Sequence, residues 1–388
     1  MRVCFISHTA DKYGAEFALL ELLQGLIAEG VDCMVLVPKK GILLGELDRL
    51  RIPWKVIGYP RWIVGTRGKW VLGRVTRTIK ALLLAIPMAW TITRWRCDLV
   101  YSNTVAIGAG AFAAWLARRP HVWHLHEFAY RDPNLLFDFG ERWTMRLMNH
   151  FSAAFVANSH AVVKDYDPYI NQQRMCVIYQ AVTLRDCDEN RQNRSTLLIK
   201  NKSNLTCVMV GSLHVAKGQD EAIRALSELV HRGIDAKLLL VGNGSRRYRE
   251  LLTKQVKFSC LEERVKFIGY AENPLKYIEI ADLVLVCSRW ETFGRVVVEA
   301  MLAEKAVIAT ANSGGPAELI QNGKTGLLYE GGNYNELADK IQFLYENPEE
   351  RLTLSKAACN WATGRFTQER YAKEIITVLN RVLNEGTV

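Results

Sequence analysis

Short apolar runs recur along the whole chain, and a glycine or a polar turn ends most of them before an amphipathic stretch of helical period begins. Runs without polar alternation are typical of strands buried on both faces of a parallel sheet. In the second half these runs are Leu205–Val210, Leu238–Val241, Val265–Ile268, Leu283–Val286 and Val307–Thr310. In the first half they are Arg2–Ser7, Cys33–Val37, Leu99–Ser102, Val122–Leu125 and Ala154–Ala157. This alternation predicts an α/β protein in which helices cover parallel sheets.

The two sets of strands predict two domains, which is also what 388 residues favour. Between them, residues 185–204 are polar and charged and are interpreted as a linker. We expect an N-terminal domain at 1–184 and a C-terminal domain at 205–364, with the C-terminal helix 365–388 packed back on the first. Open α/β sheets bind ligands at the carboxyl ends of their strands. Two doubly wound domains that face each other are therefore expected to bind a ligand in the cleft between them.

The net charge of +10 is concentrated in the first half, where residues 1–200 contain 26 Lys/Arg and 17 Asp/Glu. No acidic residue occurs from Arg49 to Arg96. Within that range, the stretch 60–96 mixes cations with tryptophans and aliphatic residues. Such a composition suits attachment to an anionic membrane surface, and it equally suits a helix with its apolar side on the sheet and its cations in water. Both interpretations stay open. Nucleic-acid binding is not expected, because the second half is nearly neutral and has no RNA-binding signature.

The nine cysteines are scattered, several lie inside apolar runs, and no CxxC occurs. This pattern indicates reduced thiols in a cytosolic protein rather than a disulfide scaffold or a zinc site. The first residues lack the features of a signal peptide. The longest apolar stretches, Ala81–Ile92 and Val105–Ala117, are shorter than a membrane-spanning helix requires. We therefore expect a cytoplasmic protein, with peripheral attachment to the inner face of the membrane as the alternative to free solution.

The stretch Ser288–Ala303 follows a predicted buried strand, and Gly294 is expected to open its helix. The first N–H groups of a helix lack intrahelical partners, and the helix dipole favours an anion there, so this helix start is predicted to bind phosphate. Glu291 precedes the helix, and Glu299 lies roughly 7 Å further along its axis. Two carboxylates that bracket a phosphate site suit a nucleotide sugar.

Six motifs follow one another in the second half: GSLHVAKG, VGNG, FIGY, ETFGRVVVE, SGGPAEL and GKTGLLY. With the early glycine turn, HLHEF and VANSHAVVKDY of the first half, they resemble the retaining family 4 glycosyltransferases of the GT-B fold. The resemblance implies two facing Rossmann-like domains. It also implies transfer of a sugar, with retention, from a UDP-type or GDP-type donor to a glycan or lipid-linked acceptor, in cell-surface polysaccharide synthesis.

The resemblance also implies roles for individual residues. Glu291 would contact the donor sugar, Glu299 the ribose, and Lys217 the leaving diphosphate. The predicted catalytic residues are Glu291, Lys217 and His126; His126 is chosen over His124, which the same side of the strand can present. The predicted donor-binding residues are Gly14, Ser212, Lys217, Tyr270, Glu291, Thr292, Phe293, Gly294, Arg295, Val296 and Glu299.

The sequence departs from the family at Ser212, where members often have arginine. Arg289 and Arg295 are the candidates to supply the missing cation.

No metal or other cofactor is predicted, because cationic side chains and helix-start amides can stabilise a leaving diphosphate. Two D-x-D strings occur, at Asp165–Asp167 and Asp186–Asp188, but neither directly follows a buried strand, and both are interpreted as solvated acids. The VGNG motif lacks the third glycine of a dinucleotide fingerprint and has Arg247 there, which disfavours a dehydrogenase. Two alternatives remain: a GT-B sugar-nucleotide epimerase, and a catalytically inactive nucleotide-sugar-binding partner protein.

Overall fold

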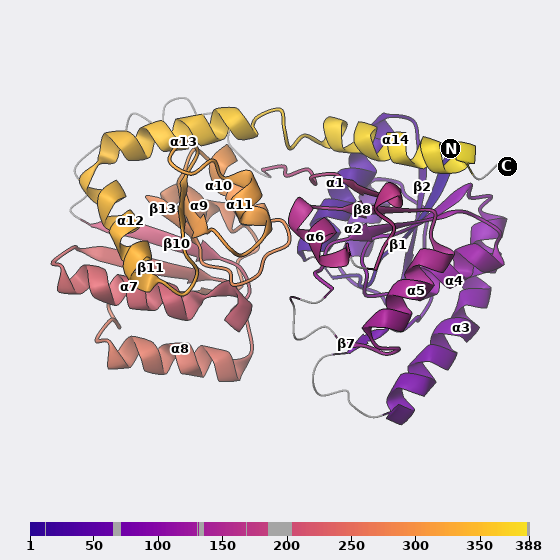
Figure 1. Cartoon of the computed structure of the whole chain (residues 1–388), viewed down its shortest axis with the longest axis horizontal. Helices are drawn as coiled ribbons and strands as arrows, with labels where there is room; N and C mark the ends of the chain where they lie inside the picture. The colour runs from indigo at the N-terminus through magenta and orange to yellow at the C-terminus, as the bar shows by residue number, and fades with distance from the viewer. Residues whose placement is uncertain are drawn as a thin grey trace. The chain divides into compact units, whose positions relative to one another are not determined.

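The computed structural model of the chain describes residues 1–11, 13–64, 71–129, 131, 136–167, 169–184 and 204–385. The chain forms two compact units (Figure 1). Unit 1 comprises Met1–Ala181 and Phe366–Val388, and unit 2 comprises Val182–Arg365. Apart from Asn204, the linker predicted at 185–204 lies outside the described residues. Each unit contains one parallel sheet with helices, so the predicted α/β fold class is confirmed.

Unit 1 has a sheet of seven parallel strands in the spatial order β3-β2-β1-β5-β6-β8-β9. The strands are β1 (Arg2–Ile6), β2 (Asp32–Val37), β3 (Trp54–Val56), β5 (Leu99–Ser102), β6 (His121–Leu125), β8 (Ala154–Ala157) and β9 (Met175–Val177). β1 pairs with β2 on one side and with β5 on the other. The chain order therefore reverses between β1 and β5, and ligands bind at such a point in doubly wound sheets.

Helices pack on both faces of this sheet. They are α1 (Gly14–Ala28), α2 (Leu43–Arg49), α3 (Val71–Arg94), α4 (Ala109–Leu116), α5 (Glu141–Phe151), α6 (His160–Tyr166) and α14 (Gln368–Glu385). Side chains alternate along β1, so Val3 and Phe5 join the core formed with α1, α2 and α14, whereas Cys4 and Ile6 join the core formed with α3 and α4. A Cβ on Gly25 of α1 would lie 2.8 Å from that of Ala372, so glycine permits the close contact between α1 and α14.

Unit 2 has six parallel strands in the order β12-β11-β10-β13-β14-β15. They are β10 (Leu205–Val210), β11 (Ala236–Val241), β12 (Val265–Gly269), β13 (Leu283–Val286), β14 (Ala306–Thr310) and β15 (Leu327–Tyr329). The helices are α7 (Gln219–His231), α8 (Arg246–Phe258), α9 (Leu275–Ile280), α10 (Arg295–Leu302), α11 (Gly315–Leu319), α12 (Tyr334–Glu346) and α13 (Pro348–Ala362). The order reverses between β10 and β13, so the loops after these two strands define the ligand-binding edge.

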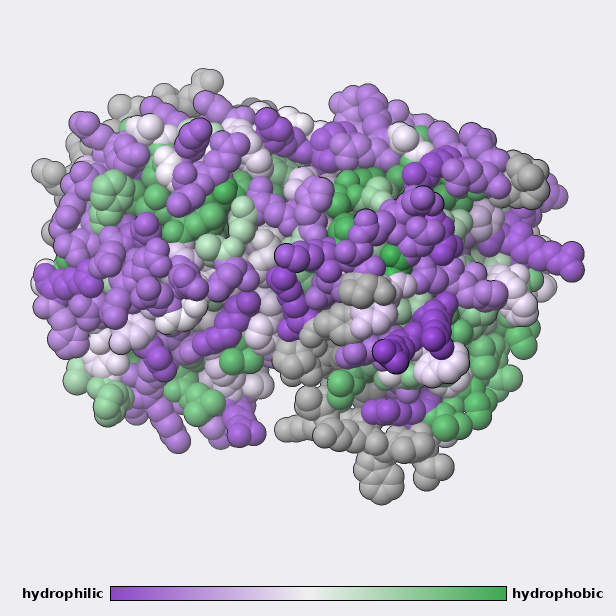
Figure 2. Space-filling model, in the orientation of Figure 1, coloured by the Kyte–Doolittle hydropathy of each residue, from purple (hydrophilic) through white to green (hydrophobic). Residues whose placement is uncertain are grey.

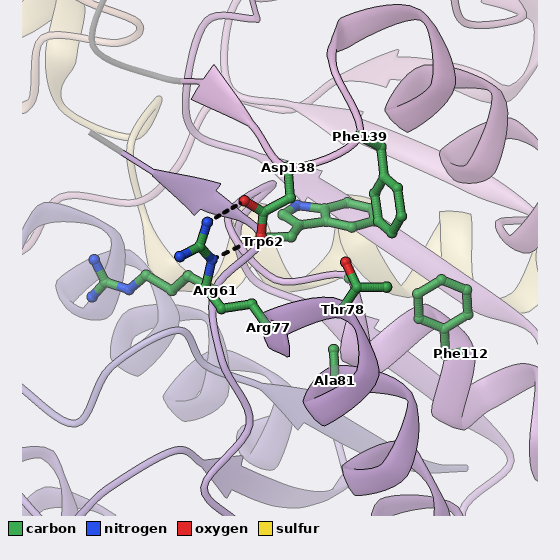
Figure 3. Close-up of a pocket in the computed structure, with 9 residues that line it drawn as sticks. Arg61, Trp62, Arg77, Thr78, Ala81, Phe112, Asp138 and Phe139 are labelled. Atoms are coloured by element: carbon green, nitrogen blue, oxygen red, sulfur yellow. Dashed lines mark hydrogen bonds and ion pairs between the residues drawn. The ribbon is translucent and has the colours of Figure 1, made fainter. Parts of the chain in front are cut away.

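An ion pair links helix α3 to the residue that follows β7 (Leu136–Phe137). Arg77 donates two hydrogen bonds to Asp138, at 3.0 and 2.6 Å, and the Asp138 side chain is only 1% exposed (Figure 3). Asp138 directly follows β7, which pairs antiparallel with β4 (Ile63–Val64). The pocket in Figure 3 lies beside this ion pair and is also lined by Trp62.

α3 is longer than the apolar stretch Ala81–Ile92 indicated. Among the described helices, it is the one that is long and apolar enough to cross a membrane by length and composition, over Gly73–Arg94. About a third of its apolar 18-residue segment is buried within the protein.

Candidate functional site

The centre of the candidate site in unit 2 is an ion pair between Lys217 and Glu291. Lys217 ends a short 3₁₀ turn, Val215–Lys217, in the loop after β10, and Glu291 lies in the loop after β13. The Lys217 Nζ donates to Glu291 Oε2, and Ser288 Oγ donates to the same oxygen at 3.2 Å. The two side chains remain 31% and 19% exposed, so a ligand can reach both.

Glycine is required where the Lys217 loop meets β13. Gly218 has φ +68°, and a Cβ there would lie 2.0 Å from the carbonyl oxygen of Cys287. No other residue type fits that approach without moving the backbone. The close contact places the end of the Lys217 turn directly against the end of β13, and this is what brings Lys217 to Glu291.

The backbone of Glu291 is fixed by the loop that precedes α11. Its N–H donates to Ser313 O at 2.9 Å, and its carbonyl accepts from the N–H of Gly315 at 2.9 Å. A Cβ on Gly315 would lie 2.5 Å from the backbone of Phe293. The loop Ser313–Gly315 therefore supports the Glu291 loop through backbone hydrogen bonds.

Helix α10 starts at Arg295, and Gly294 is its N-cap residue with φ +90°. The helix begins one residue later than predicted, and its first turn carries Arg295 and Val296. Glu299 lies one turn further and accepts from Arg295 Nε at 3.0 Å. Phe293 is buried, whereas Thr292, Val296 and Glu299 are half-buried. The predicted phosphate cradle is thus a helix start, with the Glu291 loop before it and a partly exposed carboxylate after it.

Both candidates for the cation that is missing at Ser212 are already paired with a carboxylate. Arg289 donates to both oxygens of Asp220, at 3.1 and 2.6 Å, and also to Val215 O. Burial tends to raise the pKa of Asp220, but its bonds and charge attraction to Arg289 outweigh this, and the pKa is lowered. Arg289 therefore braces the Lys217 turn from behind, and Arg295 is paired with Glu299.

Two further predicted donor residues line the same sheet edge. Ser212 lies two residues after the end of β10, and its carbonyl accepts a hydrogen bond from Gln219 Nε2 at 2.9 Å. Tyr270 directly follows β12 and its side chain is exposed.

In unit 1, His126 directly follows β6, at the carboxyl edge of the sheet. Its ring centroid lies 4.0 Å from that of His124. Burial, and to a smaller extent the charge of His8, lower the pKa of His126 to about 3, so its imidazole is neutral near pH 7. His124 is fully buried one step inside the sheet, with its Nδ1 2.9 Å from the Tyr101 hydroxyl. The structure thus places His126 at the edge and His124 in the core.

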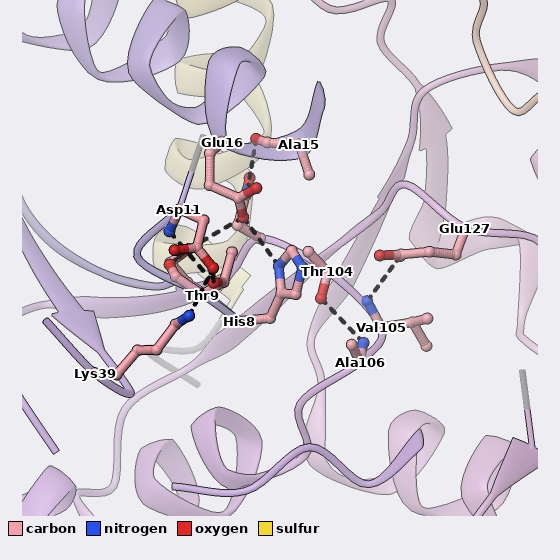
Figure 4. A network of polar contacts seen from close by, with 12 residues as sticks. His8, Thr9, Asp11, Ala15, Glu16, Lys39, Thr104, Val105, Ala106 and Glu127 are labelled. Carbon is pink, nitrogen blue, oxygen red and sulfur yellow. Dashed lines mark hydrogen bonds and ion pairs between the residues drawn. The ribbon is translucent and has the colours of Figure 1, made fainter. Parts of the chain in front are cut away.

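Glu127 is a candidate that the sequence-based reasoning did not single out, although it is the acid in HLHEF. Its Oε2 accepts from the N–H of Val105 at 3.2 Å, in the loop after β5 (Figure 4). Burial raises the pKa of Glu127 to about 7, against the opposing effect of His8. His8 follows β1 and its Nδ1 lies 3.0 Å from Oε1 of the fully buried Glu16 (Figure 4). Ionisable side chains from the loops after β1 and β6 and from the start of α1 therefore lie at this edge.

Gly14 begins α1 close to this cluster, two residues before Glu16. A Cβ at Gly14 would meet nothing within 4 Å, so the packing of the protein alone does not require glycine there.

The interpretation of the first D-x-D string as solvated acids is wrong for Asp165, whereas Asp167 is exposed as predicted. The Asp165 side chain is only 7% exposed, since its Oδ2 accepts from the N–H of Ala129 at 2.6 Å and Arg131 lies 3.9 Å from it. It is a buried brace for the loop after β6 rather than a solvated acid. Asp186–Asp188 lies outside the described residues. Within the part of the chain that the structure describes, no three His, Cys, Asp or Glu side chains gather as metal ligands.

Two Rossmann-like parallel α/β units in one chain define the GT-B class of glycosyltransferase fold. The chain belongs to the group 1 glycosyltransferases: residues 190–361 match the family model described as Glycosyl transferases group 1, and residues 13–186 match that of Glycosyltransferase Family 4. The family predicted from the motifs is thereby confirmed.

Individual relatives agree with this assignment. N-acetyl-alpha-D-glucosaminyl L-malate synthase of Bacillus anthracis is 30% identical over 48% of this chain and 48% of its own length. A Campylobacter jejuni N-acetylgalactosaminyltransferase, whose name specifies a diphospho-undecaprenol-linked acceptor, is 27% identical over 54% of each chain. The matches span about half the length of these curated relatives. The structure of Anabaena HepE in complex with UDP-glucose has a TM-score of 0.79 and 27% identity, over 98% of this chain and all of the other.

Proposed function

We propose that the protein transfers a sugar from a nucleotide-diphosphate donor to a glycan or lipid-linked acceptor. The observation that carries the proposal is the Lys217–Glu291 ion pair, placed before the α10 start at the switch point of a doubly wound sheet. A cation, the amides of a helix start and two carboxylates are the groups that a diphosphate, a sugar and a ribose require together.

The bound donor would redistribute these contacts. The diphosphate would take Lys217 and the amides at the start of α10, while Glu291 turns to the hydroxyls of the sugar and Glu299 to those of the ribose. A UDP-type donor is favoured over GDP, because HepE, which is similar over nearly the whole chain, was crystallised with UDP-glucose.

We further propose that transfer occurs with retention and without a metal ion. The bond between the anomeric carbon and the diphosphate oxygen breaks, and its electron pair leaves with the diphosphate, where Lys217 stabilises the growing charge. The acceptor oxygen bonds to the same face of the anomeric carbon, and its proton passes to the leaving diphosphate. Neutral His126 would contribute from unit 1, through its ring or its carbonyl.

Metal independence is tested by adding chelator to the purified protein during turnover. Undiminished transfer supports it, and a loss of activity that manganese restores would contradict it.

The acceptor is proposed to be lipid-linked, as the name of the Campylobacter relative specifies for that enzyme. A lipid-linked acceptor would place this enzyme in the cytoplasm at the inner face of a membrane, and a role in cell-surface polysaccharide synthesis follows from such an acceptor.

The function is tested by incubating the purified chain with UDP-sugars, with and without lipid-linked glycan acceptors, and measuring both UDP release and the fate of the sugar. Acceptor-dependent UDP release with an α-linked product supports a retaining transferase. Conversion of the UDP-sugar to its epimer without acceptor would instead show the epimerase. Nucleotide binding without UDP release for any acceptor would show the inactive partner protein.

A further inference from the structure

Helix α3 exposes a continuous row of large apolar side chains. Six of them are between 45% and 61% exposed: Val75, Ile79, Leu82, Leu83, Ile86 and Trp90. Their spacing of three, four or one residues keeps them on one face of the helix. Figure 2 shows hydrophobic side chains gathered over α3 at the lower right. A contiguous exposed apolar row of this size marks a surface that contacts another apolar phase.

The row is separate from the face by which α3 packs on its own unit. Ala81, Ala85, Met88 and Ile92 are buried in the core between α3, α4 and the sheet. The helix is thus apolar on two sides, and the inner side already accounts for its attachment to the sheet. The outer row needs a different explanation.

The charged side chains of α3 itself, and of the chain on either side of it up to Asp48 and Asp98, are all cations. No acidic residue occurs between Asp48 and Asp98, and Lys80, Arg94 and Arg96 are exposed on or just after α3. The cations of Arg94 and Lys55 lie 5.3 and 5.1 Å from the Trp90 ring centroid. An indole with two cations close to its ring, next to aliphatic side chains, is the combination that favours the headgroup level of an anionic bilayer.

The charge pattern also decides between a bilayer and the other partners of an apolar row. A second copy of the chain would bring the cations of two α3 helices together, and like charges disfavour that contact. A membrane-spanning α3 would have to withdraw Met88 and Ile92 from the core and leave Asp138 buried without Arg77. An anionic bilayer accommodates both, because its acyl chains take up the apolar row and its headgroups attract the cations.

We propose that α3 is a membrane-docking surface, which lies flat on an anionic phospholipid bilayer with its apolar row at the boundary between headgroups and acyl chains. Lys80, Arg94 and Arg96 would contact the lipid phosphates. The docking surface rests on the proposed function and deepens it, because it would hold unit 1 at the membrane, where a lipid-linked acceptor is found.

The experiment is co-sedimentation of the full chain with vesicles of phosphatidylcholine alone or mixed with phosphatidylglycerol. We expect binding to the mixed vesicles that weakens as salt is raised. The triple variant Ile79→Ser/Leu83→Ser/Ile86→Ser should bind at least about tenfold more weakly, because each exposed apolar side chain loses its transfer into the bilayer. Lys80→Gln/Arg94→Gln should bind several-fold more weakly and lose much of the salt dependence.

The matched control is Leu251→Ser/Phe258→Ser, which removes two exposed apolar side chains from α8 of unit 2 and should bind as the wild type does. Absence of wild-type binding at low salt, or equal binding by the triple serine variant, would overturn the inference. So would a wild-type dimer that the triple variant converts to monomer, since the row would then join two copies.

UDP binding, measured on the same samples, separates the two proposals. Unchanged UDP affinity with no vesicle binding rejects the docking surface alone, whereas vesicle binding without nucleotide binding rejects the donor site alone.

Discussion

Lys217 and Glu291 neutralise each other in the structure, and this has a consequence for nucleotide binding. A diphosphate competes with Glu291 for the Lys217 ammonium, so the carboxylate opposes phosphate binding even though it is needed for the sugar. Substitution of Lys217 and substitution of Glu291 are therefore expected to change UDP affinity differently. If the pair only stabilised the loops, both substitutions would change it equally.

Glu291→Gln is expected to lower transfer about 100-fold, as loss of one transition-state contact does, while UDP affinity stays equal or increases. Lys217→Met is expected to lower both transfer and UDP affinity, the latter about tenfold or more. Steady-state turnover and calorimetric titration with UDP measure the two effects. Equal loss of UDP affinity in both variants would show that the pair only braces the loops.

The buried groups at the edge of unit 1 predict opposite pH dependences of stability. The raised pKa of Glu127 means that the folded state retains a proton that the unfolded chain has lost, so stability decreases as pH rises from about 4.5 to 7. The lowered pKa of His126 means that the unfolded chain binds a proton the folded state does not, so stability decreases as pH falls from about 6.5 to 3.

Thermal melting across this range tests these contributions. Glu127→Gln should flatten the decrease towards neutral pH, and His126→Asn should flatten the decrease towards acid pH. Melting profiles with the wild-type slopes in both variants would contradict the burial that the structure gives to these side chains.

Sequence reasoning reached Glu291, Glu299 and Lys217 as candidates because each lies in a motif tied to a strand end. It missed Glu127 and misjudged Asp165, and one reason explains both errors. Whether an acid is solvated or buried depends on which loops pack against it, here those containing Val105 and Ala129, and no local pattern records that contact.

At the scale of elements, the turn that presents Lys217 depends on Gly218. Gly218→Ala would drive a Cβ into the Cys287 carbonyl, so the backbone must move, and we expect a loss of more than about 2 kcal/mol in the free energy of unfolding together with weaker UDP binding. Gly233→Ala is the matched control, because Gly233 also has positive φ but its Cβ would meet nothing within 4 Å. The control should lose about 1 kcal/mol and keep UDP binding. Denaturant unfolding that gives equal losses for both variants would disprove the close contact.

The ion pair of α3 gives a second element-scale prediction. Arg77→Met leaves the Asp138 carboxylate buried without a partner, and we expect a loss of about 3–5 kcal/mol in stability. Arg77→Met/Asp138→Leu removes the charge as well and should recover most of that loss. Urea unfolding of the three proteins measures it; a double variant no more stable than the single one would mean that the ion pair is not the cause.

Elements were predictable where the sequence pattern is long and local. The strands β5, β8, β10 and β13 have the predicted bounds, since each is a run of four to six residues closed by a turn. The three-residue strands β3, β9 and β15 were not predicted, because a segment that short shows no period and pairs only when its neighbour is already in place.

At the scale of the whole molecule, the charge asymmetry and the two sets of strands correspond to two units with separate cores. The sequence-based reasoning weighed the basic stretch 60–96 without choosing between a membrane surface and a packed helix. The structure shows why neither description suffices, since α3 has one apolar face in the core and another exposed. Because α3 is apolar on two sides, the periodicity of apolar residues in the sequence could not show which side is buried and which is exposed.

The central claim is that the α10 cradle binds the nucleotide of a sugar donor, and calorimetric titration of UDP into the wild type, Glu299→Ala and the control Glu263→Ala tests it most directly. Glu263 is exposed and precedes β12, at the opposite edge of the same sheet. Losing charge-assisted hydrogen bonds to the ribose should weaken UDP binding by Glu299→Ala about 10- to 100-fold, with Glu263→Ala unchanged. Equal UDP affinity in all three proteins would contradict the site.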